Sequence, residues 1–207
     1  MIGSVRVRRR RCTLIFFAAA LLVWTIAPSA ARADDGYDLP FAQAVRAATN
    51  DYRLQLWAKD DGYVQSTPYV ANLGVMFTNH DRFSPPDLAH PTVLIFDQAG
   101  RLVACEYQFL DGAVVPPAFK AVPPDAWYDI PRHVHFNVLV NGQMYFAQGE
   151  WATDDAPTLA NLHKHGLTPD GATLIYAFIH PKTRAFVAWA WLPNSDGLFS
   201  GENALLP

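Results

Sequence analysis

The most regular pattern of apolar and polar positions lies in residues 133–151. Two runs in which apolar and polar side chains alternate flank the dipeptide Asn141-Gly142. Alternation with a period of two predicts a strand, and Asn-Gly between two such runs is a strong hairpin signal because both residues tolerate positive φ. The pattern therefore predicts a two-residue turn with Val140 facing Gln143 and two strands pairing outward from it.

The predicted register sorts the hairpin side chains into an apolar face and a polar face. His133 lies opposite Glu150, and His135 lies opposite Gln148. Because residues i and i+2 of a strand point the same way, these four side chains share the polar face with Asn137. The apolar face, which we expect to meet the core, carries Val134, Phe136, Val138, Val140, Tyr145 and Ala147.

The rest of the chain predicts an α+β fold. Residues 40–58 place apolar side chains at three- and four-residue steps, which predicts one long amphipathic helix. Residues 158–165 predict a short helix, and residues 111–131, rich in proline, predict an irregular lid or binding loop. With the apolar runs at 73–78, 92–97, 101–109, 174–180 and 185–192, we expect a mostly antiparallel, curved or barrel-like sheet of about seven strands with the N-terminal helix packed on it.

Residues 1–33 have the features of a secretory signal peptide. Arginines precede an apolar run at 13–26, and Ala31-Arg32-Ala33 fits the small-x-small cleavage rule. The run is shorter than the ~20 residues that span a bilayer as a helix, although an uncleaved anchor is the alternative. We therefore expect cleavage after Ala33, a single mature domain at 34–207, and a periplasmic or extracellular location.

Removal of the signal changes the charge of the protein. Residues 1–33 hold six of the 16 Lys and Arg and none of the 19 Asp and Glu, so the mature chain has a formal charge of −9. This argues against nucleic acid and anionic membrane surfaces as partners. Cys105 is then the only cysteine, so no internal disulfide forms, and its apolar strand predicts a buried, unreactive thiol.

The polar face of the hairpin is the leading candidate site. His133, His135 and Glu150 form a two-His-one-carboxylate set, which suits zinc, iron, manganese or copper and leaves open positions for water or substrate. His180, at the end of a later strand, can reach the same cavity. Histidines that only make structural hydrogen bonds are the alternative, and a bulge at Gly149 would turn Glu150 to the other face.

Other residues are less specific candidates. His163 and His165 are two residues apart, which on a helix places them on different faces. Glu106 interrupts an apolar strand and is either solvent-facing or a buried functional carboxylate. A sheet cavity for a small apolar ligand can be lined by Trp127, Trp189 and Trp191 together with His180.

Two function classes follow from these residues. One is a secreted binding protein that holds a metal ion, a haem or a small apolar ligand. The other is a metal-dependent enzyme, in which the ion activates water or dioxygen and Glu106 is a second acid or base. The chain has no Gly-rich phosphate loop, no Gly-x-Ser-x-Gly and no Cys-x-x-Cys, and this lack of enzyme signatures favours binding.

Several stretches resemble a family of uncharacterised secreted bacterial proteins: residues 52–53, 61–64, 73–79, 90–97, 101–107 and 189–199, the last with the pattern Trp-x-Trp-x-x-Asn-x-x-Gly-x-Phe. The resemblance implies a secreted single domain and no particular activity. The family carries Gly-x-His-Tyr-x-Asn where this chain has Gly74 to Asn79, and a histidine at the position of Val187. The resemblance therefore implies that this chain has lost or rebuilt any site that uses those imidazoles.

Overall fold

The structure is a computed structural model that describes residues 39–71, 73–83, 87–192 and 199–200. The predicted signal segment, residues 1–33, lies outside the described residues, as do residues 193–198 of the tryptophan-containing motif. The described helices and strands are, in chain order, α1 (Leu39–Ala48), η1 (Asn50–Tyr52), α2 (Gln55–Asp60), β1 (Val64–Gln65), β2 (Val75–Thr78), β3 (Val93–Phe96), β4 (Leu102–Leu110), η2 (Pro117–Phe119), η3 (Pro124–Ala126), β5 (Tyr128–Ile130), β6 (His133–Val140), β7 (Gln143–Glu150), α3 (Leu159–Lys164), β8 (Thr173–His180), β9 (Thr183–Ala188) and β10 (Phe199–Ser200).

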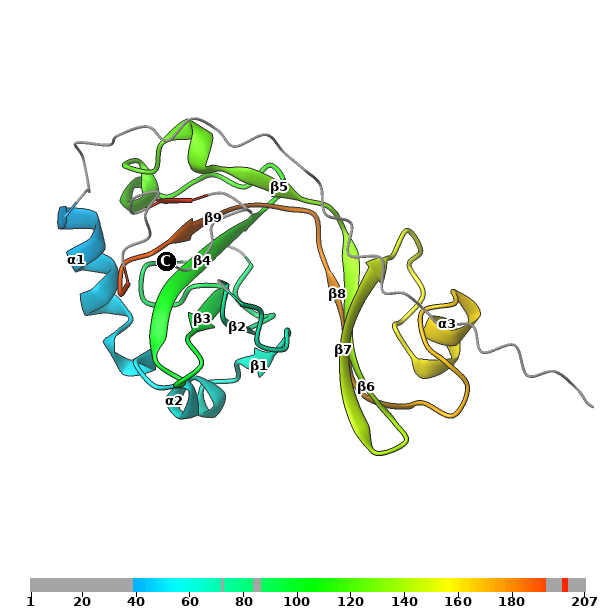
Figure 1. Cartoon of the computed structure of the whole chain (residues 1–207). Coiled ribbons are helices and arrows are strands. Elements are labelled where there is room, and N and C mark those ends of the chain that lie inside the picture. Colours follow the sequence, from blue (N-terminus) through cyan, green and yellow to red (C-terminus); the bar gives the residue numbers. More distant parts are fainter. Residues whose placement is uncertain (1–38, 72, 84–86, 193–198, 201–207) are drawn as a thin grey trace, which may run out of the picture. The chain divides into compact units, whose positions relative to one another are not determined.

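The described strands form two antiparallel sheets. A seven-stranded sheet has the order β1-β2-β3-β4-β9-β10, with β5 also paired to β9, and a three-stranded sheet has the order β7-β6-β8 (Figure 1). The α+β class and the antiparallel pairing are thus confirmed. Neither sheet closes on itself in the described part of the chain, so the barrel-like closure that we expected is not found.

Prolines mark both places where the chain passes between the two sheets. Ile130 pairs with Thr183 in the larger sheet, and His133 pairs with His180 in the smaller one. Pro131 and Pro181 lie between these pairs, one on each strand. Because proline has no backbone N–H to donate to a ladder, the pairing stops on both strands at the same level. At this level the two paired strands therefore pass from the larger sheet, where β5 pairs with β9, to the smaller sheet, where β6 pairs with β8.

The single long helix expected over residues 40–58 is wrong. The chain forms α1, the short η1 and then α2 instead. At the end of α1, the Thr49 hydroxyl donates to the Val45 carbonyl at 2.7 Å, a side-chain bond that competes with continued helix. Leu54 then forms an isolated β-bridge with Arg101, which requires extended backbone between the two helices.

The larger sheet is covered on one face by α1, α2 and the segment before β5. Phe41 and Val45 of α1 pack with Phe119 against Tyr107 and Phe186 of the sheet. Cys105 lies fully buried in this core, and burial raises the pKa of its thiol to about 12. The expected burial of this cysteine is confirmed. The opposite face carries a smaller apolar cluster made of Val93, Ile95, Val103, Ala104, Val187 and Trp189.

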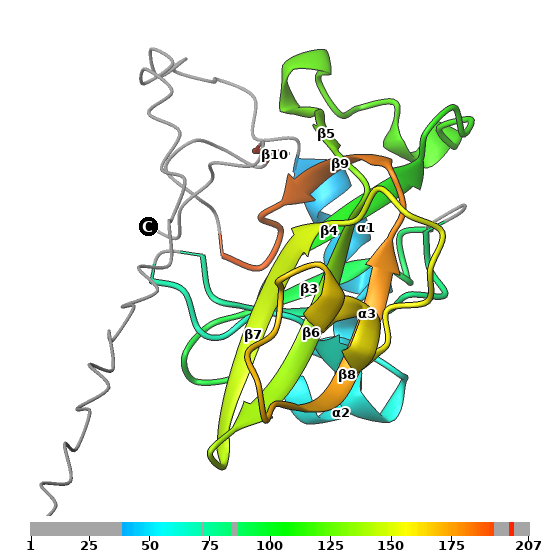
Figure 2. The ribbon, with the colours of Figure 1, turned by 90° about the vertical axis from the view of Figure 1, so that its right-hand side faces the viewer.

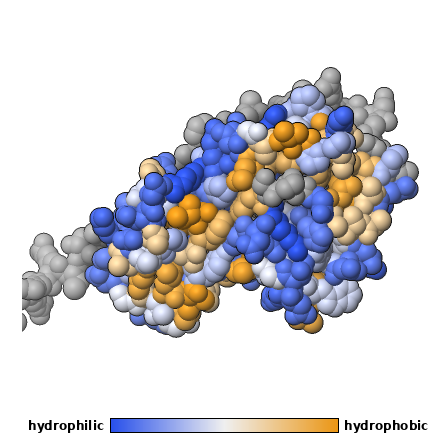
Figure 3. Space-filling model, turned by 180° about the vertical axis from the view of Figure 1, so that it is seen from behind, coloured by the Kyte–Doolittle hydropathy of each residue, from blue (hydrophilic) through white to orange (hydrophobic). Residues whose placement is uncertain are grey.

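The smaller sheet has its own apolar core. Val134, Phe136 and Val138 of β6 are buried against Leu162 of α3 and against Trp151, and α3 lies across this face of the sheet (Figure 2). The predicted apolar face of β6 is thus confirmed. On the surface, Figure 3 shows apolar residues in several separate patches among polar ones. The exposed large apolar side chains of the smaller sheet are Met144, Tyr145 and Ile175.

Gly74, just before β2, provides a test of the larger sheet. Its φ is +100°, and an added Cβ would lie 2.4 Å from the Phe96 carbonyl oxygen of the neighbouring strand. We expect Gly74→Ala to lower the free energy of unfolding by about 3 kcal/mol. Gly112 also has positive φ, at +79°, but has open space around it, so Gly112→Ala should cost only about 1 kcal/mol. Urea unfolding followed by circular dichroism measures both, and equal losses would contradict the steric argument.

Candidate functional site

The central hairpin has the predicted register. His133 pairs with Glu150, His135 with Gln148 and Val140 with Gln143. The turn between them has positive φ at both residues, 52° at Asn141 and 79° at Gly142. The pattern of alternating residues and the turn dipeptide were therefore sufficient to place the polar side chains of this hairpin.

Strand β8 brings a third imidazole to the same face. It pairs with β6 on the side away from β7, with His180 opposite His133 and Phe178 opposite His135. The ring centroids of His133 and His180 lie 4.4 Å apart, and those of His133 and His135 lie 4.6 Å apart. His180 is 6.0 Å from His135 by the same measure. The three rings that the sequence assigned to one cavity thus form one cluster.

Two of these imidazoles point at each other. The Nε2 atoms of His133 and His135 are 2.8 Å apart. The Nδ1 atom of His133 lies 2.7 Å from the Pro131 carbonyl oxygen, which only accepts, so Nδ1 carries the proton. The lone pair of His133 Nε2 is therefore directed at His135, which donates its own Nε2–H to it.

His180 is held by a different set of partners. Its Nδ1 lies 2.6 Å from the Pro181 carbonyl oxygen, and its Nε2 lies 2.8 Å from Gln108 Oε1. A neutral imidazole has a single N–H, so the neutral ring donates to only one of these two oxygens. The amide of Gln108 in turn donates to Glu106 Oε1 at 2.5 Å. Glu106 is only 2% exposed, so the solvent-facing alternative for this residue is wrong. The chain Glu106–Gln108–His180 connects β4 of the larger sheet to β8 of the smaller one.

Glu150 occupies the position opposite His133 that the sequence predicted, but its side chain is exposed. It lies on β7, at an edge of the smaller sheet. Within the described ranges, no three or more His, Cys, Asp or Glu side chains are gathered as a ready metal site. The structure therefore brings together His133, His135 and His180, with Glu150 beside them on the neighbouring strand.

His80 is a fourth imidazole that sequence reasoning did not place here. It follows β2, and its ring stacks on Phe178 with a centroid distance of 3.4 Å. Phe178 is the cross-strand neighbour of His135, so the ring of His80 lies over the sheet position beside His135. No local sequence signal identifies this residue, since its placement depends on how the two sheets meet.

Burial makes these imidazoles weak bases. Loss of solvent lowers the pKa of His135 to about 4, with a further decrease from His133. The same cause lowers the pKa of His180 and of His80 to about 3, and it lowers the pKa of His133. All four rings are therefore neutral at pH 7, which is the form in which imidazole binds a metal.

The structure does not gather the three tryptophans. Trp127 packs on Phe186 with a centroid distance of 4.8 Å, and the Trp191 indole donates to Thr49 Oγ1 at 2.9 Å. Both border the core on the helix-covered face of the larger sheet, whereas Trp189 is fully buried in the cluster on the opposite face.

The second His-x-His pair is also separated. His163 contacts the Thr168 carbonyl through Nδ1 at 3.0 Å, and its Nε2 lies 3.4 Å from Asp170. His165 packs on Trp151 with a centroid distance of 4.8 Å, and both histidines are exposed. The two rings therefore have different neighbours.

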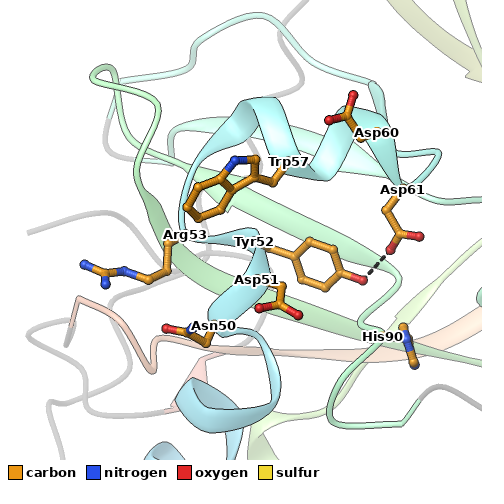
Figure 4. A pocket seen from close by; sticks show the side chains of 8 residues that line it. All are labelled: Asn50, Asp51, Tyr52, Arg53, Trp57, Asp60, Asp61 and His90. Atoms are coloured by element: carbon orange, nitrogen blue, oxygen red, sulfur yellow. Dashed lines mark hydrogen bonds between the residues drawn. The ribbon is translucent and has the colours of Figure 1, made fainter.

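Two surface hollows lie beside α2. One, of about 650 Å³, has Trp57, Arg53 and three aspartates around Tyr52, whose hydroxyl donates to Asp61 (Figure 4). The other, of about 520 Å³, lies between Trp57 and Trp191 and includes Arg53 and Arg101. Neither hollow was expected from the sequence. The first is lined almost entirely by residues 50–61, with His90, whereas the second is lined by segments far apart in the chain.

No family model matches this chain, and no curated protein or solved structure is similar to it. The resemblance to secreted bacterial proteins thus stays a prediction. Among the described helices, none combines the length and the apolar character needed to cross a membrane.

The low pKa values of the imidazoles predict acid sensitivity. Above about pH 6.5 these rings are neutral in both the folded and unfolded states, so they add no pH dependence. Below it, the unfolded chain binds protons that the folded protein excludes down to about pH 4, so stability falls with pH. We expect each of His80, His135 and His180 to contribute up to about 1.4 kcal/mol per pH unit between these limits.

Urea unfolding at a series of pH values measures this effect. Near pH 5, His135→Gln should reduce the change in the free energy of unfolding per pH unit by the amount that corresponds to about one proton. The same replacement at exposed His165 should leave this pH dependence unchanged. A wild-type stability that stays level from pH 7 to pH 5 would contradict buried neutral rings.

Proposed function

We propose that this protein is an exported metal-binding protein that holds a transition-metal ion between His133 and His135. The observation that carries the proposal is the 2.8 Å approach of their Nε2 atoms. Two ligands, each ~2.0–2.1 Å from an ion, lie ~2.9 Å apart at an angle of about 90° and ~3.3 Å apart at the tetrahedral angle of zinc, so the pair needs to open by at most about 0.5 Å to hold an ion. The bond from His133 Nδ1 to the Pro131 carbonyl is the support that metal-binding histidines commonly have.

The donor set favours particular metals. Imidazole suits zinc, copper, nickel and iron, whereas manganese prefers carboxylate, carbonyl and water oxygens. His133, His135 and His180 supply nitrogen, and the nearest sheet position with a carboxylate, that of Glu150, is exposed. We therefore propose zinc or copper ahead of iron and manganese for this site.

A metal-dependent enzyme is the alternative use of the same residues. Two imidazoles leave coordination positions for Glu150, water or a substrate, as catalysis needs. Glu106 is buried and is joined to His180 through Gln108. We favour binding over catalysis because the sequence has none of the common enzyme signatures.

Metal content tests the proposal. We expect purified protein, stripped with chelator and reloaded with Zn²⁺, to retain about one ion per chain by elemental analysis, and the double change His133→Ala, His135→Ala to abolish retention. The matched control is His163→Ala, His165→Ala, which removes the exposed His-x-His pair and should retain the ion. Equal retention by all three proteins, or none by the wild type, would refute the site.

A second candidate function, the binding of a small apolar ligand, is favoured by the hollow between Trp57 and Trp191. Its volume of about 520 Å³ is within the range of small-molecule sites, and Trp57 is 47% exposed. Its lining also includes Arg53, together with Arg101 in an ion pair with Asp97, so Arg53 would suit an anionic group on an apolar molecule.

An anionic fluorescent probe with an aromatic body, anilinonaphthalene sulfonate, tests this hollow. We expect Trp57→Ala to weaken binding of the probe at least about fivefold, because the aromatic wall is lost, and Trp127→Ala to have no such effect. Equal weakening by both changes would indicate general loosening of the core rather than a site.

A further inference from the structure

We propose that His80 is a third ligand of the same ion, so that the metal joins the two sheets. This inference rests on the proposed function of His133 and His135 and adds the ligand that sequence reasoning missed. His80 follows β2 of the larger sheet, whereas the other two imidazoles belong to β6 of the smaller one.

The first argument is that His80 lacks hydrogen-bond partners. Both its ring nitrogens are inaccessible to solvent and neither has a partner among the described residues. A buried polar atom without a partner is destabilising, so native proteins rarely keep one. The two nitrogens of one ring in this condition point to a group that binds there, and a neutral imidazole nitrogen is suited to a transition metal.

The second argument is position. His80 stacks on Phe178 at 3.4 Å, and Phe178 lies directly across the ladder from His135. Cross-strand neighbours have Cβ atoms ~5 Å apart. The ring of His80 therefore lies over the face of the smaller sheet that carries His133 and His135.

The third argument concerns His180, the other imidazole within reach. Both of its ring nitrogens already face oxygen atoms, those of Pro181 and Gln108. Its use as a ligand would break the bond to Gln108 and disturb the attached Glu106. His80 has no such bond to lose, so it is the better third ligand.

The three ligands define the class of ion. Three neutral imidazoles without a carboxylate make a positively charged complex with any divalent ion, and this set is typical of zinc and copper sites with one open position. The ion would also cross-link the sheets. Direct contacts between the sheets include the bond from Asn137 Nδ2 to the Gln65 carbonyl at 3.2 Å, and a bound ion would add to them.

The test uses His80→Phe, which preserves the aromatic stack on Phe178 and removes both ring nitrogens. We expect the metal-free variant to be at least as heat-stable as the wild type, because two buried polar atoms disappear. Its affinity for Zn²⁺ should fall at least about tenfold, and most of the rise in Tm that saturating Zn²⁺ gives the wild type should be lost. The matched control, His165→Phe, changes an exposed histidine and should leave the affinity as it is.

The outcomes separate this inference from the proposed function. A wild-type protein that binds no Zn²⁺ overturns both. Zn²⁺ binding that is lost with His133→Ala, His135→Ala but is equal in His80→Phe and wild type overturns only the role of His80.

A second measurement covers the case in which His80→Phe does not fold. Wild-type protein loaded with Cu²⁺ should show three coordinated nitrogens by pulsed electron paramagnetic resonance. To identify the third ring as His80 rather than His180, the spectrum is repeated with His180→Gln, which should keep all three nitrogens. Two nitrogens in the wild type, or a loss of one in His180→Gln, would overturn the assignment.

Discussion

The interruption of backbone pairing at Pro131 and Pro181 is the constraint on which the rest of this fold depends. Pairing resumes at His133 and His180, directly beyond the two prolines. The carbonyl oxygen of each proline then lies within hydrogen-bond distance of the Nδ1 atom of the adjoining histidine. The residues that end pairing in the larger sheet thus also fix the orientation of two imidazoles at the start of the smaller one.

The contact between the sheets is polar, although both sheets have apolar cores. Glu106 and Gln108 of β4 reach His180 of β8 in a chain of hydrogen bonds. Buried amides and carboxylates are stable only when their partners are in place, so this chain restricts how the smaller sheet can pack on the larger one. The same burial removes solvent from the imidazoles and keeps them neutral.

The sequence was informative where local chemistry decides the structure. Alternation around Asn141-Gly142 predicted the complete register of β6 and β7. Prediction from the sequence failed where contacts between distant residues determine the structure. One example is the bridge between Leu54 and Arg101, which interrupts the expected long helix. The packing of one sheet on the other determines the surroundings of His80 and of buried Glu106. No periodicity or residue spacing in the sequence indicates that packing. The pairing of β5 with β9 was hidden in a proline-rich segment for the same reason.

In the proposed site, metal binding would be coupled to the packing of the sheets, because the imidazoles come from both sides of one contact. Metal binding at a pair within β6 alone would leave the sheets independent of the ion. A ligand from the segment after β2 makes the packing of the sheets part of the binding equilibrium, since each stabilises the other by the same free energy. The nitrogens of His80, which have no partner among the described residues, fit the second arrangement, because their burial costs stability that a ligand between the sheets would restore.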